Sequence, residues 1–150
     1  MREPYQILSI PYRIVDGIPM FCVFRRADSG YWQFIAGGGE NGETPIQAAG
    51  RETVEEIGIE PKNMTQLDSI ACVPSEVIAE SRRQHWDKNI VVIHEYAFAF
   101  ECDSEPILSN EHTEYKWLNY EEARKLLKWD SNKVAMYEIY SKTTLNIENH

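Results

Sequence analysis

Residues 37–59 constrain the fold of this 150-residue chain more than any other stretch. The stretch begins with three glycines, continues through a segment crowded with glutamates, and closes on a Gly-Ile pair. Thr44 predicts a helix start, because its hydroxyl can cap free amides, Pro45 suits the first helical position, and Gln47 can reach back to the cap. Gly58 predicts the end of this helix. We therefore expect a glycine loop, a capped helix and a terminating turn.

The expected helix separates apolar from acidic side chains. At about 100° per residue, one side takes Ile46, Ala49, Gly50, Thr53, Val54 and Ile57. Glu52, Glu55 and Glu56 share an arc of about 100° on the other side. Like charges at this spacing weaken a helix, and only Arg51 stands among them as a local counterion. These acids suit either a solvated helix face or a site for divalent cations such as Mg²⁺, which take oxygen ligands.

Composition and charge limit the class of protein and its partners. A chain of 150 residues with 43% hydrophobic content is long enough for one domain, spanning 1–150, around one core. The net charge of −9 and the pI near 4.9 argue against a nucleic-acid partner, because such binders present clustered Lys and Arg. A small polyphosphate is compatible with this acidity, since bound metal ions would screen its charge.

The cysteines and the chain start bear on the compartment. Cys22, Cys72 and Cys102 lie far apart, show no CxxC spacing, and each sits in an apolar run, which predicts buried free thiols in a reducing compartment. The first residues lack a long apolar core, and no run approaches about 18 apolar residues. We expect a cytoplasmic protein without a membrane segment, either a monomer or a homodimer.

Hydropathy patterns predict a sheet with flanking helices. The expected strands are 5–15, broken at Pro11, then 20–26, 31–36, 67–78, interrupted at Pro74, 90–101 and 115–118. Asp16-Gly17 predicts the turn of a hairpin. The expected helices are 120–129 and 131–140, with 141–150 frayed. We expect strand 90–101 at the centre of the sheet.

Two basic segments have roles that the residues leave open. Arg25 and Arg26 end the second predicted strand, where they are either solvated or hold a substrate phosphate. The polar segment 79–89 contains Arg82, Arg83, His85 and Trp86. It is either a surface connection or a loop that closes over a substrate.

The acidic stretch resembles a known family signature. Gly37, Glu43 and the run from Arg51 to Ile59, at their observed spacing, are similar to the fixed positions of the Nudix (MutT-type) hydrolases. Thr53 stands where that family usually has an aliphatic residue. The resemblance implies an α+β protein with the Nudix fold, which is an α/β/α sandwich with a mixed sheet and a catalytic loop–helix–loop. It also implies Mg²⁺ or Mn²⁺ dependence and hydrolysis of a nucleoside diphosphate linked to another group.

The family resemblance implies roles for the acidic residues. It places metal ligands on Glu52 and Glu56, on Glu55 in many members, and on the backbone carbonyl of the Gly37 loop. It makes Glu43 a residue that orders the site and Arg51 its orienting partner. The candidate catalytic residues are Glu43, Arg51, Glu52, Glu55 and Glu56. Which carboxylate takes a proton from the attacking water stays open at this point.

A second resemblance touches the rest of the chain. Residues 31–33, 111–118 and 129–132 are similar to segments of the bacterial dihydroneopterin triphosphate and dATP-type pyrophosphohydrolases. The likeness implies a metal ligand at Glu111, chosen over the competing acids Glu95, Glu101 and Glu114. It also places Arg2, Arg25 and Lys128 in contact with the substrate. The pair Gly38-Gly39 and Ala36 depart from the pattern of the enterobacterial members.

The sequence thus predicts a Mg²⁺-dependent enzyme that splits a nucleoside or pterin triphosphate into a monophosphate and pyrophosphate. Dinucleoside polyphosphates, nucleotide sugars and oxidised nucleotides are alternative substrates within the same class. A nucleotide-sensing module without catalysis is the alternative from another class, and the intact set of glutamates argues against it.

Overall fold

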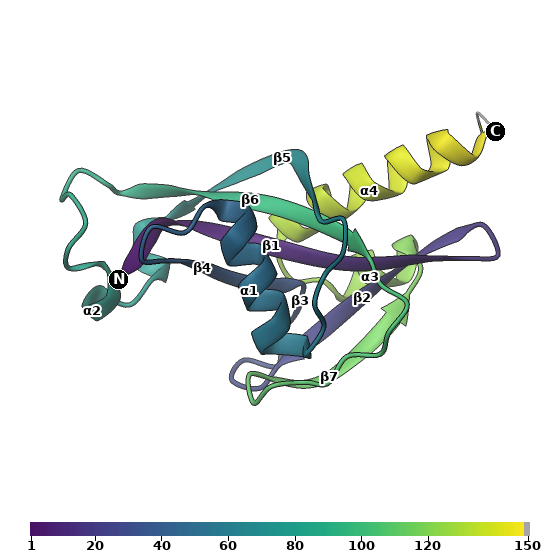
Figure 1. Ribbon diagram of the computed structural model, residues 1–150, viewed down its shortest axis with the longest axis horizontal. Coiled ribbons are helices and arrows are strands. Elements are labelled where there is room, and N and C mark those ends of the chain that lie inside the picture. Colours follow the sequence, from purple (N-terminus) through teal and green to yellow (C-terminus); the bar gives the residue numbers. More distant parts are fainter. Residues whose placement is uncertain (149–150) are drawn as a thin grey trace.

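The structure is a computed structural model that describes residues 1–148, and its helices cover both faces of one mixed seven-stranded sheet (Figure 1). The strands are β1 Arg2–Val15, β2 Ile18–Arg26, β3 Trp32–Gln33, β4 Ile35–Glu40, β5 Thr65–Pro74, β6 Val92–Glu101 and β7 His112–Leu118. The helices are α1 Pro45–Ile57, α2 Glu80–Arg83, α3 Tyr120–Leu126 and α4 Asp130–Glu148, with a 3₁₀ turn, η1, at Ser75–Val77. No helix in residues 1–148 is long and apolar enough to cross a membrane.

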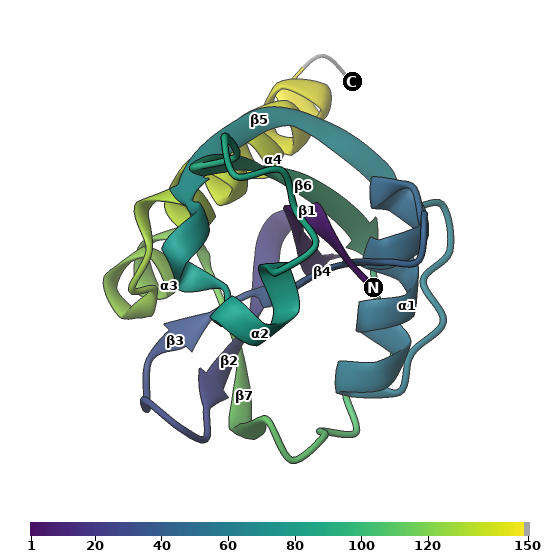
Figure 2. The same ribbon diagram turned by 90° about the vertical axis from the view of Figure 1, so that its left-hand side faces the viewer.

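The sheet order is β3-β2-β1-β6-β5, with β4 also paired to β1 and β7 to β2. Strands β1 and β6 are parallel and the other pairs are antiparallel, so the sheet is mixed. Helix α1 packs against β1 and β4, whereas α3 and α4 pack against β2 and β5 on the opposite face (Figures 1 and 2). The predicted α/β/α sandwich is confirmed.

Strand β1 runs without interruption through the proline that was expected to break it. Its partner changes from β4, up to Ser9, to β2, from Tyr12 onward. Pro11 falls between these two partners, where a residue without an N–H is tolerated. Asp16 and Gly17 then form the predicted hairpin turn, both with positive φ, at 52° and 79°.

Helix α1 has the ends that its sequence predicts. The Thr44 side chain accepts a hydrogen bond from the Gln47 N–H, and the Gln47 side chain accepts one from the Thr44 N–H, forming a capping box. Pro45 occupies the first turn. Gly58 ends the helix in the left-handed region, at φ 68°, and donates its N–H to the Val54 carbonyl.

The buried face of α1 is narrower than predicted. Ala49, Thr53 and Ile57 are buried, but Ile46 and Val54 are 47% and 39% exposed. The helix contacts mainly β1 and β4, so only the side chains on the arc that faces those strands are buried. The Thr53 hydroxyl donates to the Ala49 carbonyl at 2.7 Å and lies 2.7 Å from the Ser9 hydroxyl. These partners satisfy a polar group at a position where the family usually has an aliphatic residue.

Gly50 allows a stability test of α1. A Cβ added at this mid-helix position meets no atom within 4 Å. We expect Gly50→Ala to raise the free energy of unfolding by about 0.5–1 kcal/mol, because glycine loses more backbone entropy in a helix than alanine. Urea denaturation measures the difference. A loss of stability would show that the helix does not form as described.

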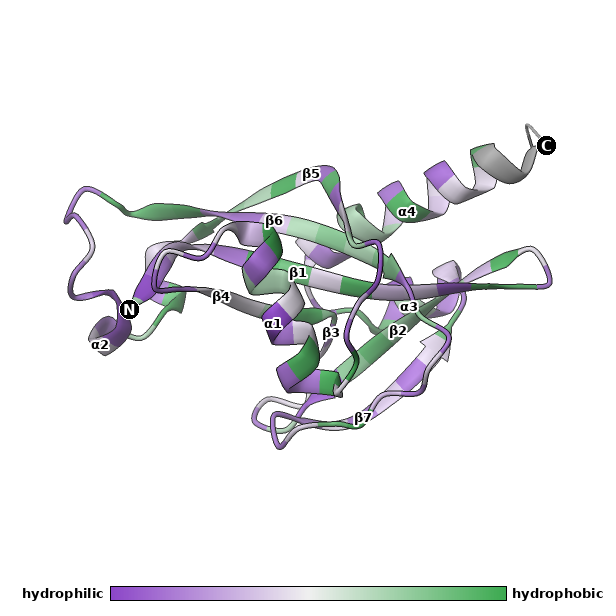
Figure 3. Cartoon of the chain, in the orientation of Figure 1, coloured by the Kyte–Doolittle hydropathy of each residue, from purple (hydrophilic) through white to green (hydrophobic). Residues whose placement is uncertain are grey.

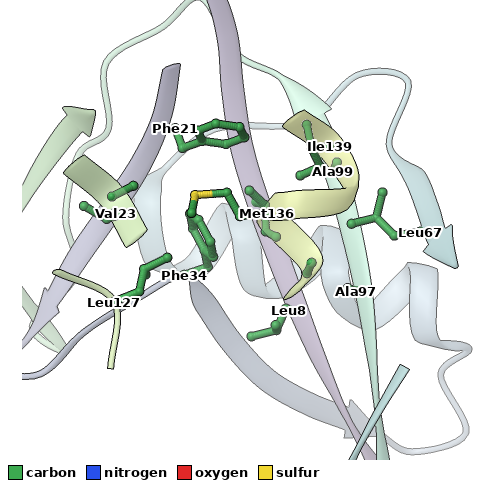
Figure 4. Close-up of a cluster of buried hydrophobic side chains, with 13 residues drawn as sticks. Leu8, Phe21, Val23, Phe34, Leu67, Ala97, Ala99, Leu127, Met136 and Ile139 are labelled. Atoms are coloured by element: carbon green, nitrogen blue, oxygen red, sulfur yellow. The ribbon is translucent and has the colours of Figure 1, made fainter. Parts of the chain in front are cut away.

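The main core lies between the sheet and the helices α3 and α4. Met136 of α4 lies among Phe21, Phe34 and Leu127 (Figure 4). Smaller clusters lie under α1, where Ile57 and Ala49 pack against the sheet. Strand β2 is largely hydrophobic, whereas the connection that carries α2 is hydrophilic (Figure 3). Strand β6 lies between β1 and β5, which places it inside the sheet as predicted.

The cysteine prediction is correct at two positions and wrong at the third. Cys22 and Cys102 are buried in one core cluster, whereas Cys72 is exposed. Cys72 lies on β5, the last strand in the sheet order. Ile70 and Pro74, two residues before and after it, are exposed on the same face of the strand. Neighbouring elements leave this face of β5 uncovered, so an apolar run did not ensure burial.

Three predicted segments differ in extent or character. The connection 79–89 contains α2 and a buried side chain, Trp86, and is not merely a surface loop. Helix α3 ends at Leu126 because Leu127 bridges to Trp32. Helix α4 continues to Glu148, beyond the predicted end at 140. Residues 149 and 150, also predicted to be frayed, lie outside the described residues.

Glu138 holds α4 against a bulge in β5. The register of β5 shifts between Gln66 and Ile70, and the Glu138 carboxylate accepts the N–H groups of Asp68 and Ser69 there, each at 2.8 Å. Lys142 donates to the same carboxylate at 2.6 Å. Burial alone would raise the pKa of Glu138, but Lys142 and these donors lower it to about 2.

The depressed pKa of Glu138 predicts a pH-dependent stability. The stabilisation is present above the ordinary value of 4.5 and is lost as the pH falls towards about 2. We expect Glu138→Gln to lower the free energy of unfolding by about 2 kcal/mol at pH 7, since it removes charge-assisted hydrogen bonds. Urea denaturation from pH 7 to pH 2 should show the difference shrinking below pH 4.5. A difference that stays constant over this range would contradict the assignment.

Candidate active site

A cavity of about 620 Å³ lies on the sheet face that carries α4. Its floor includes Leu8, which belongs to the core cluster under that helix. From α1 and the nearby strand ends it receives Arg26, Gly37, Glu52 and Glu111. From β3, β6 and the start of α4 it receives Gln33, Glu95, Trp129, Ser131 and Asn132. Segments that are far apart in the chain thus meet around one polar hollow.

Strand register aligns polar groups across the cavity floor. Gly38 on β4 pairs with Gln6 on β1, and Gln6 pairs with Glu95 on β6. Residues in register on adjacent strands share one face of a sheet. The floor therefore carries a bare glycine, an amide and a carboxylate side by side.

The three consecutive glycines lie in β4, and not in a loop as predicted. A Cβ at Gly37 would lie 2.4 Å from Cδ of Glu52, and one at Gly38 would lie 1.1 Å from Nη1 of Arg2. A Cβ at Gly39 would lie 2.0 Å from the Tyr5 hydroxyl. The glycines leave room for these side chains to pack directly on the strand backbone.

Arg51 joins α1 to the turn after β4. Its Nε and Nη2 donate to the two carboxylate oxygens of Glu43 at 2.8 and 3.0 Å, and Nη2 also donates to the Gly38 carbonyl at 2.9 Å. Its Nη1 donates to Glu52 and Glu55 at 3.2 and 3.1 Å. Arg51 lowers the pKa of the Glu43 carboxyl. This geometry suits the orienting role that the resemblance implies for the Arg51–Glu43 pair.

The environment of Glu52 disfavours the charged form of its carboxylate. Burial raises its pKa to about 7, and the negative charge of Glu55 adds to the rise, while Arg51 opposes it. Its side chain lies against the bare backbone of Gly37. Glu55, by contrast, is exposed at the helix surface.

Glu56 faces inward from α1 towards the loop before β7. Its Oε2 lies 3.1 Å from Nδ1 of His112 and accepts a hydrogen bond from the Ser109 hydroxyl at 2.9 Å. Burial would raise the pKa of Glu56, but His112 and Ser109 lower it. Burial and the negative charge of Glu56 raise the pKa of the Glu111 carboxyl. The three acids therefore do not all point the same way as predicted, because Glu56 is buried and turns away from the exposed Glu55.

The donor set fits a hard divalent cation. Glu52, Glu56, Glu111 and the backbone of Gly37 supply the oxygen ligands that Mg²⁺ prefers. The absence of a Cβ at Gly37 creates the space in which the Glu52 carboxylate sits. Within residues 1–148, no three Asp, Glu, His or Cys side chains already converge on one point. Arg51 and Arg26 instead form ion pairs with Glu52 and Glu111, and Nδ1 of His112 lies 3.1 Å from Glu56.

The predicted substrate residues fall in different places. Arg2 lines the cavity at only 4% exposure, and its Nη2 donates to Gln6 at 2.7 Å. Arg25 points out of the cavity and donates to the Gly30 carbonyl and to Glu114. Lys128 is exposed, with Nζ 5.0 Å from the ring centroid of Tyr31. Substrate contacts by these three residues stay predictions.

Sequence reasoning missed several residues of the site. Arg26, and not Arg25, lines the cavity, because successive side chains of a strand point to opposite faces. His112 received no role, although it directly follows Glu111. Glu95 was considered only as a competing metal ligand. Knowing the register of β6 against β1 would have placed Glu95 on the cavity floor.

The connection between β5 and β6 touches the start of β1. The Trp86 Nε1 donates to the Arg2 carbonyl at 2.7 Å, and the His85 Nε2 lies 2.7 Å from the same oxygen. Arg82 lines the cavity and pairs with Glu40. The connection and the chain start lie side by side in both views (Figures 1 and 2). This contact brings one residue of the connection, Arg82, to the cavity edge.

A glutamate-rich helix docked on a mixed sheet beside this polar cavity defines the class of protein, a hydrolase with an α/β/α architecture. The NUDIX domain model matches residues 16–138, which is more than half of the chain. The chain therefore belongs to the Nudix family of hydrolases, as its acidic signature predicted.

Relatives with known names cover nearly the whole chain. The dihydroneopterin triphosphate diphosphatase of Escherichia coli K12 is 32% identical over 90% of this chain and 91% of its own length. The asymmetrical bis(5'-nucleosyl)-tetraphosphatase of Sus scrofa is 31% identical over 83% of this chain and 81% of its own. The crystal structure of a candidate NUDIX hydrolase from Listeria monocytogenes is similar to this chain, with a TM-score of 0.83 and 38% sequence identity. The match covers 96% of this chain and 97% of the Listeria chain.

Proposed function

We propose that this protein is a metal-dependent pyrophosphohydrolase that splits a nucleoside or pterin triphosphate into its monophosphate and pyrophosphate. The observation that carries the proposal is a single cavity whose lining includes the acids Glu52 and Glu111 and the guanidinium groups of Arg2 and Arg26. The acids suit a cation and the guanidinium groups suit phosphate oxygens. The Escherichia coli relative, named for dihydroneopterin triphosphate, supports this substrate class.

The reaction joins water to a phosphoanhydride. The water oxygen forms a bond to one phosphorus, the bridging P–O bond breaks, and pyrophosphate leaves. The proton of the water passes to a carboxylate of the site. Bound Mg²⁺, or Mn²⁺, would screen the phosphate charges and acidify the attacking water.

The residues of the chain have distinct tasks in this proposal. Glu52, Glu56 and Glu111, with the Gly37 backbone, would hold the cation, and a metal contact by the exposed Glu55 stays a prediction from the resemblance. Arg51 keeps α1 in position against β4, since it pairs with Glu43 and also donates to the Gly38 carbonyl. His112 fixes the Glu56 carboxylate from the opposite side.

A second candidate substrate is a dinucleoside polyphosphate. The specific support is the Sus scrofa relative, which is named for bis(5'-nucleosyl) tetraphosphate. Nucleotide sugars, oxidised nucleotides and binding without catalysis are weaker alternatives. All of these share the phosphoanhydride group, so the products of the reaction must separate them.

A substrate panel tests the proposal. The protein is incubated with nucleoside triphosphates, 7,8-dihydroneopterin triphosphate and dinucleoside tetraphosphates, with Mg²⁺, with Mn²⁺ or with chelator. We expect a monophosphate and pyrophosphate, formed only when the metal is present. Two nucleotides as products would favour the dinucleoside substrate, and orthophosphate would contradict the cleavage position. If no phosphoanhydride is hydrolysed, the result would favour the alternative of a nucleotide-sensing module without catalysis.

Compartment and assembly belong to the same proposal. We infer a cytoplasmic enzyme that is a monomer or a homodimer. The high pKa of the Cys22 thiol, raised chiefly by burial, suits a thiol that stays reduced. Light scattering with size-exclusion chromatography measures the oligomeric state, and cell fractionation measures the compartment.

A further inference from the structure

Glu95 lies on the cavity floor without a task in the proposed reaction. It is 7% exposed, and its Oε1 has no hydrogen-bond partner. Buried polar side-chain atoms in folded proteins are nearly always hydrogen-bonded, so an orphaned carboxylate oxygen beside a cavity calls for a donor from outside the protein. The same cavity is also lined by Glu52, an acid of the proposed cation site.

The surroundings of Glu95 do not neutralise it. Its register neighbour Gln6 accepts a hydrogen bond from Arg2 through Oε1, and within residues 1–148 the Gln6 amide N–H groups do not reach Glu95 Oε1. No salt bridge within residues 1–148 includes Glu95. Burial raises the pKa of the Glu95 carboxyl, and the Ser131 hydroxyl only partly opposes the rise. The carboxylate is therefore short of donors in the protein alone.

We propose that Glu95 recognises the heterocycle of the substrate, by accepting two adjacent N–H donors of a 2-amino-4-oxopyrimidine edge. Guanine and pterins share this edge, on which a ring N–H stands beside an exocyclic amine. A carboxylate accepts through both oxygens and can pair with two such donors at once. This inference rests on the proposed function, because it assigns the base of that triphosphate.

Other bases do not offer the same pattern. Adenine and cytosine place an acceptor nitrogen beside the exocyclic amine, and uracil has one ring N–H between two carbonyls. Each would set a lone pair against a carboxylate oxygen. Glu95 therefore selects guanine and pterin rings against the three others.

Neighbouring side chains complete the pattern. Gln33 uses its Oε1 to accept from the Trp129 indole at 3.1 Å, which leaves its amide NH₂ to donate to the oxo group of the ring. Asn132 is occupied, because its Oδ1 accepts the Phe34 N–H at 2.8 Å. Trp129 lines the same cavity and offers an aromatic face. The same cavity therefore holds an acceptor for the two N–H groups of the ring and a donor for its oxo group.

The test compares the native protein with Glu95→Gln, using GTP, ITP and ATP with Mg²⁺. ITP keeps the ring N–H of GTP but lacks the exocyclic amine. We expect native kcat/KM to favour GTP over ITP by about 10-fold and over ATP by about 100-fold. Glu95→Gln should lower kcat/KM for GTP and 7,8-dihydroneopterin triphosphate by about 10–100-fold, and change that for ATP by less than about threefold.

Glu101→Gln is the matched control, because Glu101 lies on the same strand and is exposed at its end. It should leave all three kcat/KM values unchanged. A native protein that does not separate GTP from ITP would overturn the inference, even if all three are hydrolysed. So would an equal loss for all three substrates in Glu95→Gln.

A binding measurement separates this inference from the proposed function. GMP and AMP are titrated against the protein without metal, and the change in tryptophan fluorescence is followed. If no triphosphate is hydrolysed but Glu95→Gln weakens GMP binding at least 10-fold and leaves AMP binding unchanged, the proposed function fails and the recognition by Glu95 stands. If GMP binds equally to native protein and variant, or does not bind, the recognition fails.

Discussion

Glu56→Gln is expected to lower kcat by about 1,000-fold or more while the protein stays folded. The substitution keeps the shape of the side chain and removes one negative charge from the proposed cation site. The Glu56 carboxylate is buried and held by Ser109 and His112. No mobile side chain can therefore move in and replace its negative charge. Pyrophosphate release under saturating Mg²⁺ measures the effect.

Glu60→Gln provides the comparison for this prediction. Glu60 follows α1 and is exposed, so its amide variant should keep native kcat. Thermal unfolding of both variants shows whether the fold is retained. A reduction of less than about tenfold in Glu56→Gln would contradict the assignment of Glu56 to the cation site.

Gly37→Ala is expected to lower kcat/KM by about 100-fold. The added Cβ would lie 2.4 Å from Cδ of Glu52, so either the carboxylate or β4 must shift. A displacement of about 1 Å at a reacting centre costs about this much. Turnover of the substrate identified by the panel measures the loss.

The matched control for this glycine is Gly50→Ala in the same signature. An added methyl group there meets open space, so activity should stay native while stability rises. If Gly37→Ala also keeps native activity, the close packing of Glu52 on β4 is not required for function.

The ends of α1 could be predicted because they depend on neighbours in the chain. Thr44 and Gln47 are three residues apart and satisfy each other wherever the helix packs. Gly58 ends the helix through its own backbone conformation. The Asp16-Gly17 turn follows from the same kind of local rule, and all three features form as expected.

Predictions about faces and burial were less successful. Ile46 and Val54 lie on the apolar side of α1 and yet are exposed, because the strands beneath cover a narrower arc. Arg26 lines the cavity and Arg25 does not, because the two side chains lie on opposite faces of β2. Substrate contact by Arg25 stays a prediction. Cys72 is exposed because no helix or strand within residues 1–148 covers its face of β5.

By itself, the sequence determined the acidic helix with both of its ends, because these depend on residue types at short, regular spacing, and its resemblance to the Nudix signature implied the family and the sandwich fold. The tertiary structure alone decided that Gly38, Gln6 and Glu95 share a row, and that His112 meets Glu56. These contacts join residues far apart in the chain. Their positions follow from strand register and helix docking, which are set by the packing of the whole core and not by local hydrogen bonds.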